Sequence, residues 1–164
     1  KSVLITGVSG AGKSALSTKL VEMGYTAYDM EEIPELFSML DKKTGEPVVD
    51  HDNADLKKVL DMDWVCDTNK LASIIADEPS ELAFYCGSAS NIDAILPFFD
   101  LVIMLKVGHE TMRHRLTTRT GNDFGRTTEV QDWIITWKDW WENDMQEKGA
   151  IVVDAHKSLD EIAK

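Results

Sequence analysis

The sequence predicts a three-layer α/β domain with a five-stranded, mostly parallel sheet and helices on both faces. Short, continuously apolar runs such as 82–86 and 101–105 are typical of strands buried on both faces of a parallel sheet. Segments with helical spacing separate these runs. The glycine-rich residues 7–14 join the first apolar run to a helical pattern. The 164 residues, 43% of them hydrophobic, suit one domain spanning 1–164.

Periodicity and turn residues place the individual elements. The expected strands are 3–6, 25–28, 82–86, 101–105 and 151–153. One helix follows residue 14 directly, and others are expected at about 31–40, 56–60, 69–76, 110–118 and 129–147, with a terminal helix from Ser158. Gly45 and Pro47 mark a surface turn, and Pro79 follows the end of a helix. The helical spacing of Trp133, Ile134, Trp137 and Trp141 predicts a packed core face.

Composition and charge exclude several classes of protein. Seventeen Lys and Arg against twenty-nine Asp and Glu give a net charge of -12, which disfavours a nucleic-acid partner. The two cysteines, Cys66 and Cys86, indicate neither a zinc site nor a disulfide framework. No apolar run reaches membrane-spanning length, and the first residues lack a secretory signal pattern. We therefore expect a cytoplasmic protein with no membrane partner, either a monomer or a homodimer.

Residues 7–14, with the sequence GVSGAGKS, form a Walker A motif, or P-loop. Glycines let the backbone curl so that successive N–H groups point at an anion, and the following helix adds its positive N-terminal dipole. The expected nucleotide cradle comprises Gly7, Ser9, Gly10, Ala11 and Gly12. Lys13 is expected to bind the β- and γ-phosphates and the Ser14 hydroxyl to bind Mg²⁺. A plain glycine-rich turn between strand and helix is the alternative.

ATP is the favoured nucleotide. The segment 69–72 reads NKLA and so lacks the aspartate of a guanine-recognition element. The sequence therefore predicts ATP and Mg²⁺ as cofactors.

Arginine is concentrated in one short segment. All four arginines lie within fourteen residues, at Arg113, Arg115, Arg119 and Arg126. The segment 120–125 contains two glycines and several polar residues, which is typical of a mobile loop. Guanidinium groups on such a loop suit a lid, at about 119–128, that closes over phosphate and excludes water. We expect Arg119 and Arg126 to act on the phosphates, whereas a solvated helix with ordinary salt bridges is the alternative, above all for Arg113.

Polar residues follow the second and third strands of the predicted sheet. Asp29 and Glu31 come after the second strand, where a carboxylate could hold Mg²⁺ through water and accept the proton of an attacking hydroxyl. The alternative is that Asp29 caps the following helix. Gly87, Ser88 and Asn91 follow the third strand and could bind an acceptor, or equally form a helix cap.

The order of these motifs resembles the P-loop small-molecule and nucleoside monophosphate kinases, the shikimate kinase-like members in particular, over nearly the whole chain. The matching features are the Walker loop, D-x-E after the second strand, a small polar segment with glycine after the third, and R-T-x5-R in a lid. The resemblance implies a three-layer P-loop NTPase fold with a short lid. It places Arg119 against adenine, Arg126 on the transferring phosphates, and Asp29 beside metal and acceptor.

The same resemblance implies roles for two further regions. Residues Asp154 and His156, after the last strand, would lie near the base of the nucleotide. An acceptor-side insertion at about 31–67 would face the acceptor, with the acidic stretch around Asp50 and Asp52 and with Trp64.

The sequence departs from the resembled family on the acceptor side. The third strand ends without a Walker B aspartate or the glycine triplet of shikimate kinases, and no arginine precedes Arg113. Residues 45–50 are faintly similar to gluconate kinases, and 50–86 to atypical adenylate kinases. Because anionic acceptors are normally held by arginines, a neutral or hydroxyl-bearing acceptor gains weight.

These features together predict an ATP-dependent phosphotransferase that moves the γ-phosphoryl group to a small-molecule acceptor. Two alternatives stay open. One is a nucleoside monophosphate (adenylate-like) kinase, and the other is a nucleotide-binding ATPase or switch without a dedicated acceptor.

Overall fold

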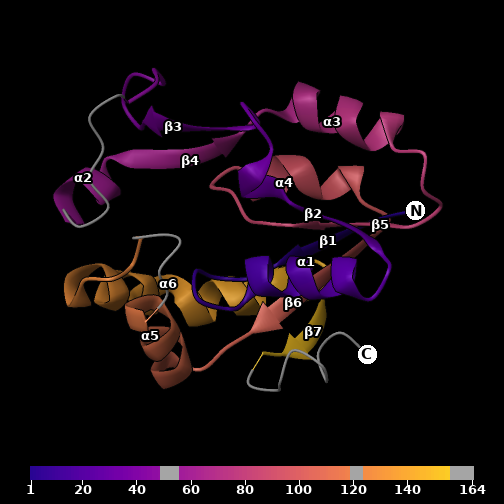
Figure 1. Ribbon diagram of the computed structural model, residues 1–164. Coiled ribbons are helices and arrows are strands. Elements are labelled where there is room, and N and C mark those ends of the chain that lie inside the picture. The colour runs from indigo at the N-terminus through magenta and orange to yellow at the C-terminus, as the bar shows by residue number, and fades with distance from the viewer. Residues whose placement is uncertain (49–55, 119–123, 156–164) are drawn as a thin grey trace.

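The computed structural model describes residues 1–48, 56–118 and 124–155, and its centre is a five-stranded sheet (Figure 1). The strand order is β2-β5-β1-β6-β7, and every neighbouring pair is parallel. The strands are β1 (Ser2–Thr6), β2 (Thr26–Asp29), β5 (Ala83–Cys86), β6 (Leu101–Lys106) and β7 (Ile151–Asp154). The prediction of a five-stranded parallel sheet is confirmed.

Helices cover both faces of this sheet, which confirms the three layers (Figure 1). The α-helices are α1 (Lys13–Glu22), α2 (Leu56–Leu60), α3 (Thr68–Asp77), α4 (Ile92–Ile95), α5 (His109–Thr118) and α6 (Thr128–Glu147). Short 3-10 helices occur at Met30–Glu32 (η1) and Leu96–Phe98 (η2). The side chains of Asp67 and Thr127 accept hydrogen bonds from the first turns of α3 and α6, so capping fixes where these two helices begin. None of the described helices has both the length and the apolarity to cross a membrane.

Two hydrophobic clusters lie on opposite faces of the sheet because side chains alternate along each strand. Val3 and Ile5 of β1 pack with α1, α5 and the first half of α6. Leu4 faces the other way, into a cluster with α3 and α4. Trp133, Trp137 and Trp141 of α6 pack against these clusters, and Ile134 is buried, so the predicted core face of α6 is confirmed.

The expected helix at 31–40 is wrong. After η1 the chain turns and forms β3 (Phe37–Asp41), which pairs antiparallel with β4 (Met62–Cys66), a strand that the sequence analysis missed. The turn places Glu35 after Pro34 with a positive φ of 63°, which a helix cannot accommodate. Phe37 and Trp64 then stack across this strand pair with ring centroids 5.0 Å apart. A contact with a strand 25 residues away therefore overrides the local helical spacing.

Three expected features fall in segments outside the described residues. These are the acidic part of the insertion at Asp50 and Asp52, the start of the predicted lid at 119–123, and the terminal helix from Ser158.

A buried ion pair joins α6 to the end of β6. Lys138 Nζ lies 2.6 Å from Glu142 Oε1, and both side chains are 2% exposed. The other carboxylate oxygen, Oε2, accepts a hydrogen bond from the Val107 N–H at 3.3 Å. The pair therefore fixes the turn between β6 and α5.

Replacing Glu35 with Gly is expected to raise the free energy of unfolding by about 0.5–1 kcal/mol, because glycine adopts a positive φ without the penalty that a side chain incurs. The weak exposed pair with Lys70, 3.7 Å away, offsets little of this gain. Urea denaturation measures the change. The matched control is Glu32→Gly, an exposed glutamate in η1 with an ordinary φ, which is expected to lose stability instead. Equal effects of the two substitutions would contradict the strained turn.

Replacing Lys138 with Met is expected to lower the free energy of unfolding by about 3–5 kcal/mol, because it leaves the Glu142 carboxylate buried without its partner. The control Lys148→Met removes a lysine whose ion pairs, with Asp93 and Asp144, are exposed, and its effect is expected to be far smaller. Denaturant titration of both variants makes the comparison, and similar losses would argue against a special role for the buried pair.

Candidate functional site

The P-loop leaves the carboxyl end of β1 as a tight curl that only glycine permits at its main bends. Gly10 and Gly12 have positive φ angles of 87° and 103°. A Cβ atom on Gly7 would lie 2.9 Å from both the Ala11 Cβ and the Leu105 carbonyl oxygen. The loop therefore has both the conformation and the close packing that an anion-binding cradle requires.

Lys13, the first residue of α1, lies over this curl. Its Nζ donates hydrogen bonds to the carbonyl oxygens of Gly7 at 2.6 Å and Val8 at 2.9 Å. Ser14 follows on the first turn of the helix and is exposed. The first turn of α1 contains no acidic residue, so nothing within that turn cancels the positive end of the helix dipole.

Asp29 ends β2 and caps η1. One of its oxygens, Oδ1, accepts a hydrogen bond from the Glu31 N–H at 3.1 Å. The structure thus shows the capping role that the sequence left as an alternative. A carboxylate has a second oxygen, so capping leaves Asp29 able to contact a metal or an acceptor. Glu31 is exposed beside it, and its contact with substrate stays a prediction.

The Cys86 thiol shows that Asp29 and Lys13 share one edge of the sheet. Cys86 pairs with Asp29 in the register of β5 and β2. Burial raises the pKa of the Cys86 thiol to about 12, and the Asp29 charge raises it too, whereas a hydrogen bond with Ser17 and the Lys13 charge lower it. Both charged groups therefore act on one thiol at the carboxyl end of the sheet.

The oxygen ligands at this edge fit Mg²⁺. Among the described residues no three His, Cys, Asp or Glu side chains gather into a metal-binding group. Mg²⁺ bound to nucleotides keeps several waters and takes only one or two protein ligands besides the phosphates. The Ser14 hydroxyl and the Asp29 carboxylate have the required chemistry.

The residues after β5 make packing contacts and hydrogen bonds that the sequence did not reveal. Gly87 is buried and packs closely against Met30. A Cβ atom on Gly87 would lie 3.0 Å from the Met30 Cβ. Asn91 Oδ1 accepts a hydrogen bond from the Cys66 N–H, and its Nδ2 donates one to the Cys66 carbonyl, both at 2.9 Å. Ser88, between them, is half-buried. Binding of an acceptor by these residues stays a prediction.

The same segment fixes the two-stranded β3–β4 sheet at the carboxyl end of the central sheet. The Trp64 N–H donates to Ser90 Oγ at 3.0 Å, and the Ser90 N–H donates to the Trp64 carbonyl at 2.7 Å. Together with the Asn91 bonds, these contacts attach β4 to the end of β5 as a strand neighbour would. The predicted insertion is thus tied to the sheet edge that carries the P-loop.

The arginine segment separates into different environments. Arg113 forms an ion pair with Asp132 and donates a hydrogen bond to Gln131 Oε1 at 3.3 Å, so the salt-bridge alternative is confirmed for this residue. Arg126 is exposed just before α6, and its predicted contact with phosphate stays a prediction. Arg119 lies outside the described residues.

Gln131 is a functional candidate that the sequence analysis missed. It is 4% exposed, and its Nε2 donates to the Gly125 carbonyl at 2.9 Å, the Arg126 carbonyl at 3.3 Å and the Thr117 hydroxyl at 3.1 Å. These bonds fix the backbone that carries the Arg126 side chain. A signal existed, because Gln131 is a polar residue on the inward stripe of α6 with Ile134.

The end of β7 lies beside β6. Asp154 pairs with Lys106 in the register of these strands and is exposed, while the next N–H, of Ala155, donates to the Lys106 carbonyl at 2.8 Å. His156 lies outside the described residues. The predicted contacts of Asp154 and His156 with the nucleotide base stay predictions.

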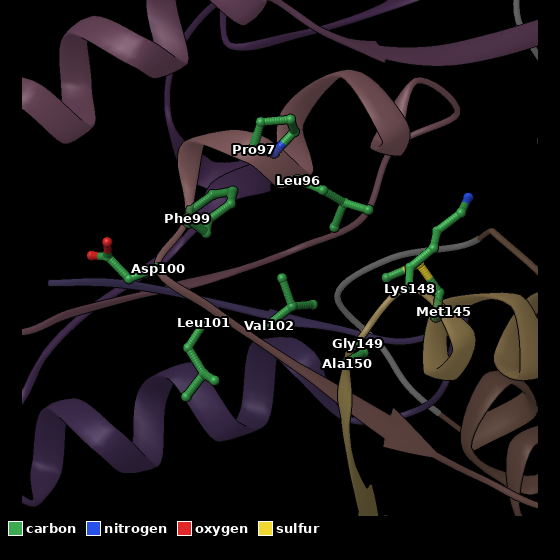
Figure 2. Close-up of a pocket in the computed structure, with 10 residues that line it drawn as sticks. All are labelled: Leu96, Pro97, Phe99, Asp100, Leu101, Val102, Met145, Lys148, Gly149 and Ala150. Atoms are coloured by element: carbon green, nitrogen blue, oxygen red, sulfur yellow. The ribbon is translucent and has the colours of Figure 1, made fainter.

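The cavity in Figure 2 is not the phosphate site. It has a volume of about 380 Å³ and lies at the amino ends of β6 and β7, the edge opposite the P-loop. Its two charged residues are already paired, since Asp100 accepts a hydrogen bond from the Ser2 N–H and Lys148 binds Asp93. A second cavity, of about 510 Å³, lies between α6 and the carboxyl ends of β6 and β7.

Comparison with known proteins gives structural but no sequence relatives. No family model and no curated protein matches this sequence. The solved structure of a deoxyadenosine kinase from M. mycoides with bound dATP is similar, at 16% identity and a TM-score of 0.59 over 99% of this chain and 95% of that one. The shikimate kinase from Aquifex aeolicus vf5 is 17% identical with a TM-score of 0.55, over 99% and 91% of the two chains.

A gluconokinase from Sinorhizobium meliloti 1021 is also similar, at 22% identity and a TM-score of 0.52 over 99% of this chain and 86% of that one. Identities this low establish a shared fold and nothing finer. The strand order, the P-loop after β1 and these three neighbours agree: the chain has the fold of the P-loop small-molecule kinases.

Proposed function

We propose that this protein is an ATP- and Mg²⁺-dependent phosphotransferase that moves the γ-phosphoryl group to a small-molecule acceptor. The observation that carries the proposal is the P-loop geometry, with its glycines at positive φ and with Lys13 over the curl. Asp29, at the end of β2 on the far side of β5 from β1, supplies a carboxylate at the same edge. The similar fold of several kinases supports the same reaction class.

Each group then has a defined task in phosphoryl transfer. Lys13 exchanges its two carbonyl partners for β- and γ-phosphate oxygens, and the cradle amides bind the remaining charge. When bound, Mg²⁺ offsets the charge that develops on the phosphates, and Ser14 and Asp29 hold it, Asp29 through water. Asp29 also accepts the proton that the acceptor hydroxyl loses on attack. Arg119 and Arg126 stabilise the transferring group, with Arg119, Asp154 and His156 near the base.

The acceptor in this proposal is a neutral hydroxyl compound. On the acceptor side, Lys42 lies 3.9 Å from Asp63, and Lys70 donates to the Pro34 carbonyl, so each has a structural partner. No arginine precedes Arg113 in the sequence. A phosphate or carboxylate on the acceptor is normally gripped by guanidinium groups, and this edge instead presents carboxylates. These observations favour a neutral acceptor over a nucleoside monophosphate.

An acceptor screen tests the proposal against its rivals. Purified protein with ATP and Mg²⁺ is incubated with nucleosides, nucleoside monophosphates, sugars, sugar acids and shikimate, and ADP release and product mass are recorded. ADP release stimulated many-fold by a neutral hydroxyl compound, with a phosphorylated product, is expected. Stimulation by a monophosphate would indicate the adenylate-like alternative, and acceptor-independent ADP release would indicate an ATPase or switch.

Replacing Lys13 with Met is expected to lower phosphoryl transfer about 100-fold or more and to weaken ATP binding, because it removes the ammonium group that lies over the curl. Calorimetry with Mg²⁺ and ATP measures binding, and ADP release measures turnover. Lys19→Met, which removes a lysine from the last turn of the same helix, is the control and is expected to retain both. Wild-type binding in the Lys13 variant would remove this lysine from the site.

Replacing Arg126 with Ala is expected to lower turnover by about 10²- to 10⁴-fold with ATP binding largely intact, if its guanidinium acts on the transferring phosphoryl group. Single-turnover kinetics separates this effect from product release. Lys148→Ala removes one positive charge at the opposite edge of the sheet and controls for net charge. Turnover unchanged in the Arg126 variant would exclude it from the mechanism.

A further inference from the structure

Arg115 of α5 connects two segments that the proposed nucleotide would touch. Its guanidinium donates hydrogen bonds to the Gly10 carbonyl at 3.5 Å and the Ala11 carbonyl at 3.0 Å, both in the P-loop. It also donates one to the Ala155 carbonyl at 2.6 Å, directly after β7. The three acceptors are backbone oxygens from chain segments more than 140 residues apart.

Tight packing fixes the helix that carries Arg115. Met112 and Leu116 on either side of it are fully buried. A Cβ atom on Gly10 would lie 3.1 Å from the Leu116 Cγ and 3.2 Å from the Met112 carbonyl oxygen, so α5 rests directly on the P-loop. The bond from the Val107 N–H to Glu142 anchors the turn before this helix. Arg115 is therefore presented from a rigid support.

The bond to Ala11 has a consequence for anion binding. A peptide unit is planar, with its N–H on the side opposite its carbonyl, so a donor that fixes the Ala11 carbonyl also fixes the N–H of Gly12. That N–H belongs to the cradle. The guanidinium also brings a positive charge to the back of the loop, 3.7 Å from where a Cβ atom on Gly12 would lie. Arg115 thus acts on this peptide unit from its carbonyl side, opposite the Gly12 N–H.

We propose that Arg115 is a positioning residue for the nucleotide: it fixes the P-loop amides and joins them to the chain after β7, so that the triphosphate and base sites keep one relative position. The inference rests on the proposed function, because it requires a nucleotide that spans both segments. Among the residues that the structure describes, the hydrogen-bond acceptors of Arg115 are backbone oxygens, so its role is positioning through the loop.

Calorimetry on Arg115→Met and Arg115→Lys tests this inference, with MgATP and magnesium tripolyphosphate as ligands. The Met variant loses three charge-assisted hydrogen bonds, so its Kd for MgATP is expected to rise about 10- to 100-fold, with the Lys variant intermediate. Tripolyphosphate has no base, so its affinity is expected to fall less. Lys148→Met, which removes the same charge elsewhere, is expected to match wild type. A change in MgATP Kd below twofold, or equal losses for both ligands, would overturn the inference.

Steady-state kinetics and hydrogen exchange separate positioning from general damage. In Arg115→Met the KM for ATP is expected to rise while the KM for the acceptor stays unchanged. Without any ligand, amide exchange is expected to quicken in residues 8–12 and at Ala155, and to stay unchanged in α3. If the wild-type protein binds no nucleotide, the proposed function is wrong, but amide exchange still tests the inference. Unchanged exchange at both segments in Arg115→Met would show that Arg115 does not join the P-loop to the chain after β7. Should the Met variant fail to fold, the Lys variant gives the same comparisons.

Discussion

The site depends on one constraint, the close approach of the P-loop backbone to its neighbours. A cradle for anions must turn its N–H groups inward, which leaves carbonyl oxygens facing out, and buried carbonyls need donors. In this chain Lys13 supplies donors to Gly7 and Val8, and Arg115 supplies donors to Gly10 and Ala11. These two cations therefore lie where the carbonyl oxygens of the loop need donors. The rest of the site is arranged around that curl.

Local patterns were sufficient to predict the central sheet and most helices, because the inner strands β1, β5 and β6 are largely apolar runs and most helices show their own period. The prediction of a helix around Phe37 and Met39 was wrong because the local pattern there is ambiguous. Its apolar residues fit a helix as well as a strand, and the decision came from pairing with Trp64, distant in the sequence. The turn at Glu35 could not be anticipated either, since glutamate rarely adopts a positive φ.

The candidate site was only partly predictable, because motif residues are local and their partners are not. The Walker loop could be located from spacing alone, whereas nothing near Gly87 in sequence indicates that it packs under Met30. Nothing near Asn91 in the sequence indicates that its amide binds the backbone of Cys66 with both its oxygen and its nitrogen. A usable signal was present in α6, where Gln131, like the buried ion pair, interrupts the apolar stripe. Polar residues on an inward face must have partners, so they point to structural networks.

The four arginines fall into two groups according to their contacts. Arg113 is engaged with α6, and Arg115 is engaged with the P-loop, so two of the four guanidinium groups hold the scaffold. The proposed function assigns the phosphates of the nucleotide to the other two, Arg119 and Arg126. An anionic acceptor is normally held by further guanidinium groups, and no arginine precedes Arg113 in the sequence. The small number of arginines therefore supports the proposed acceptor, a compound with hydroxyl groups and no negative charge, separately from the carboxylates at the sheet edge.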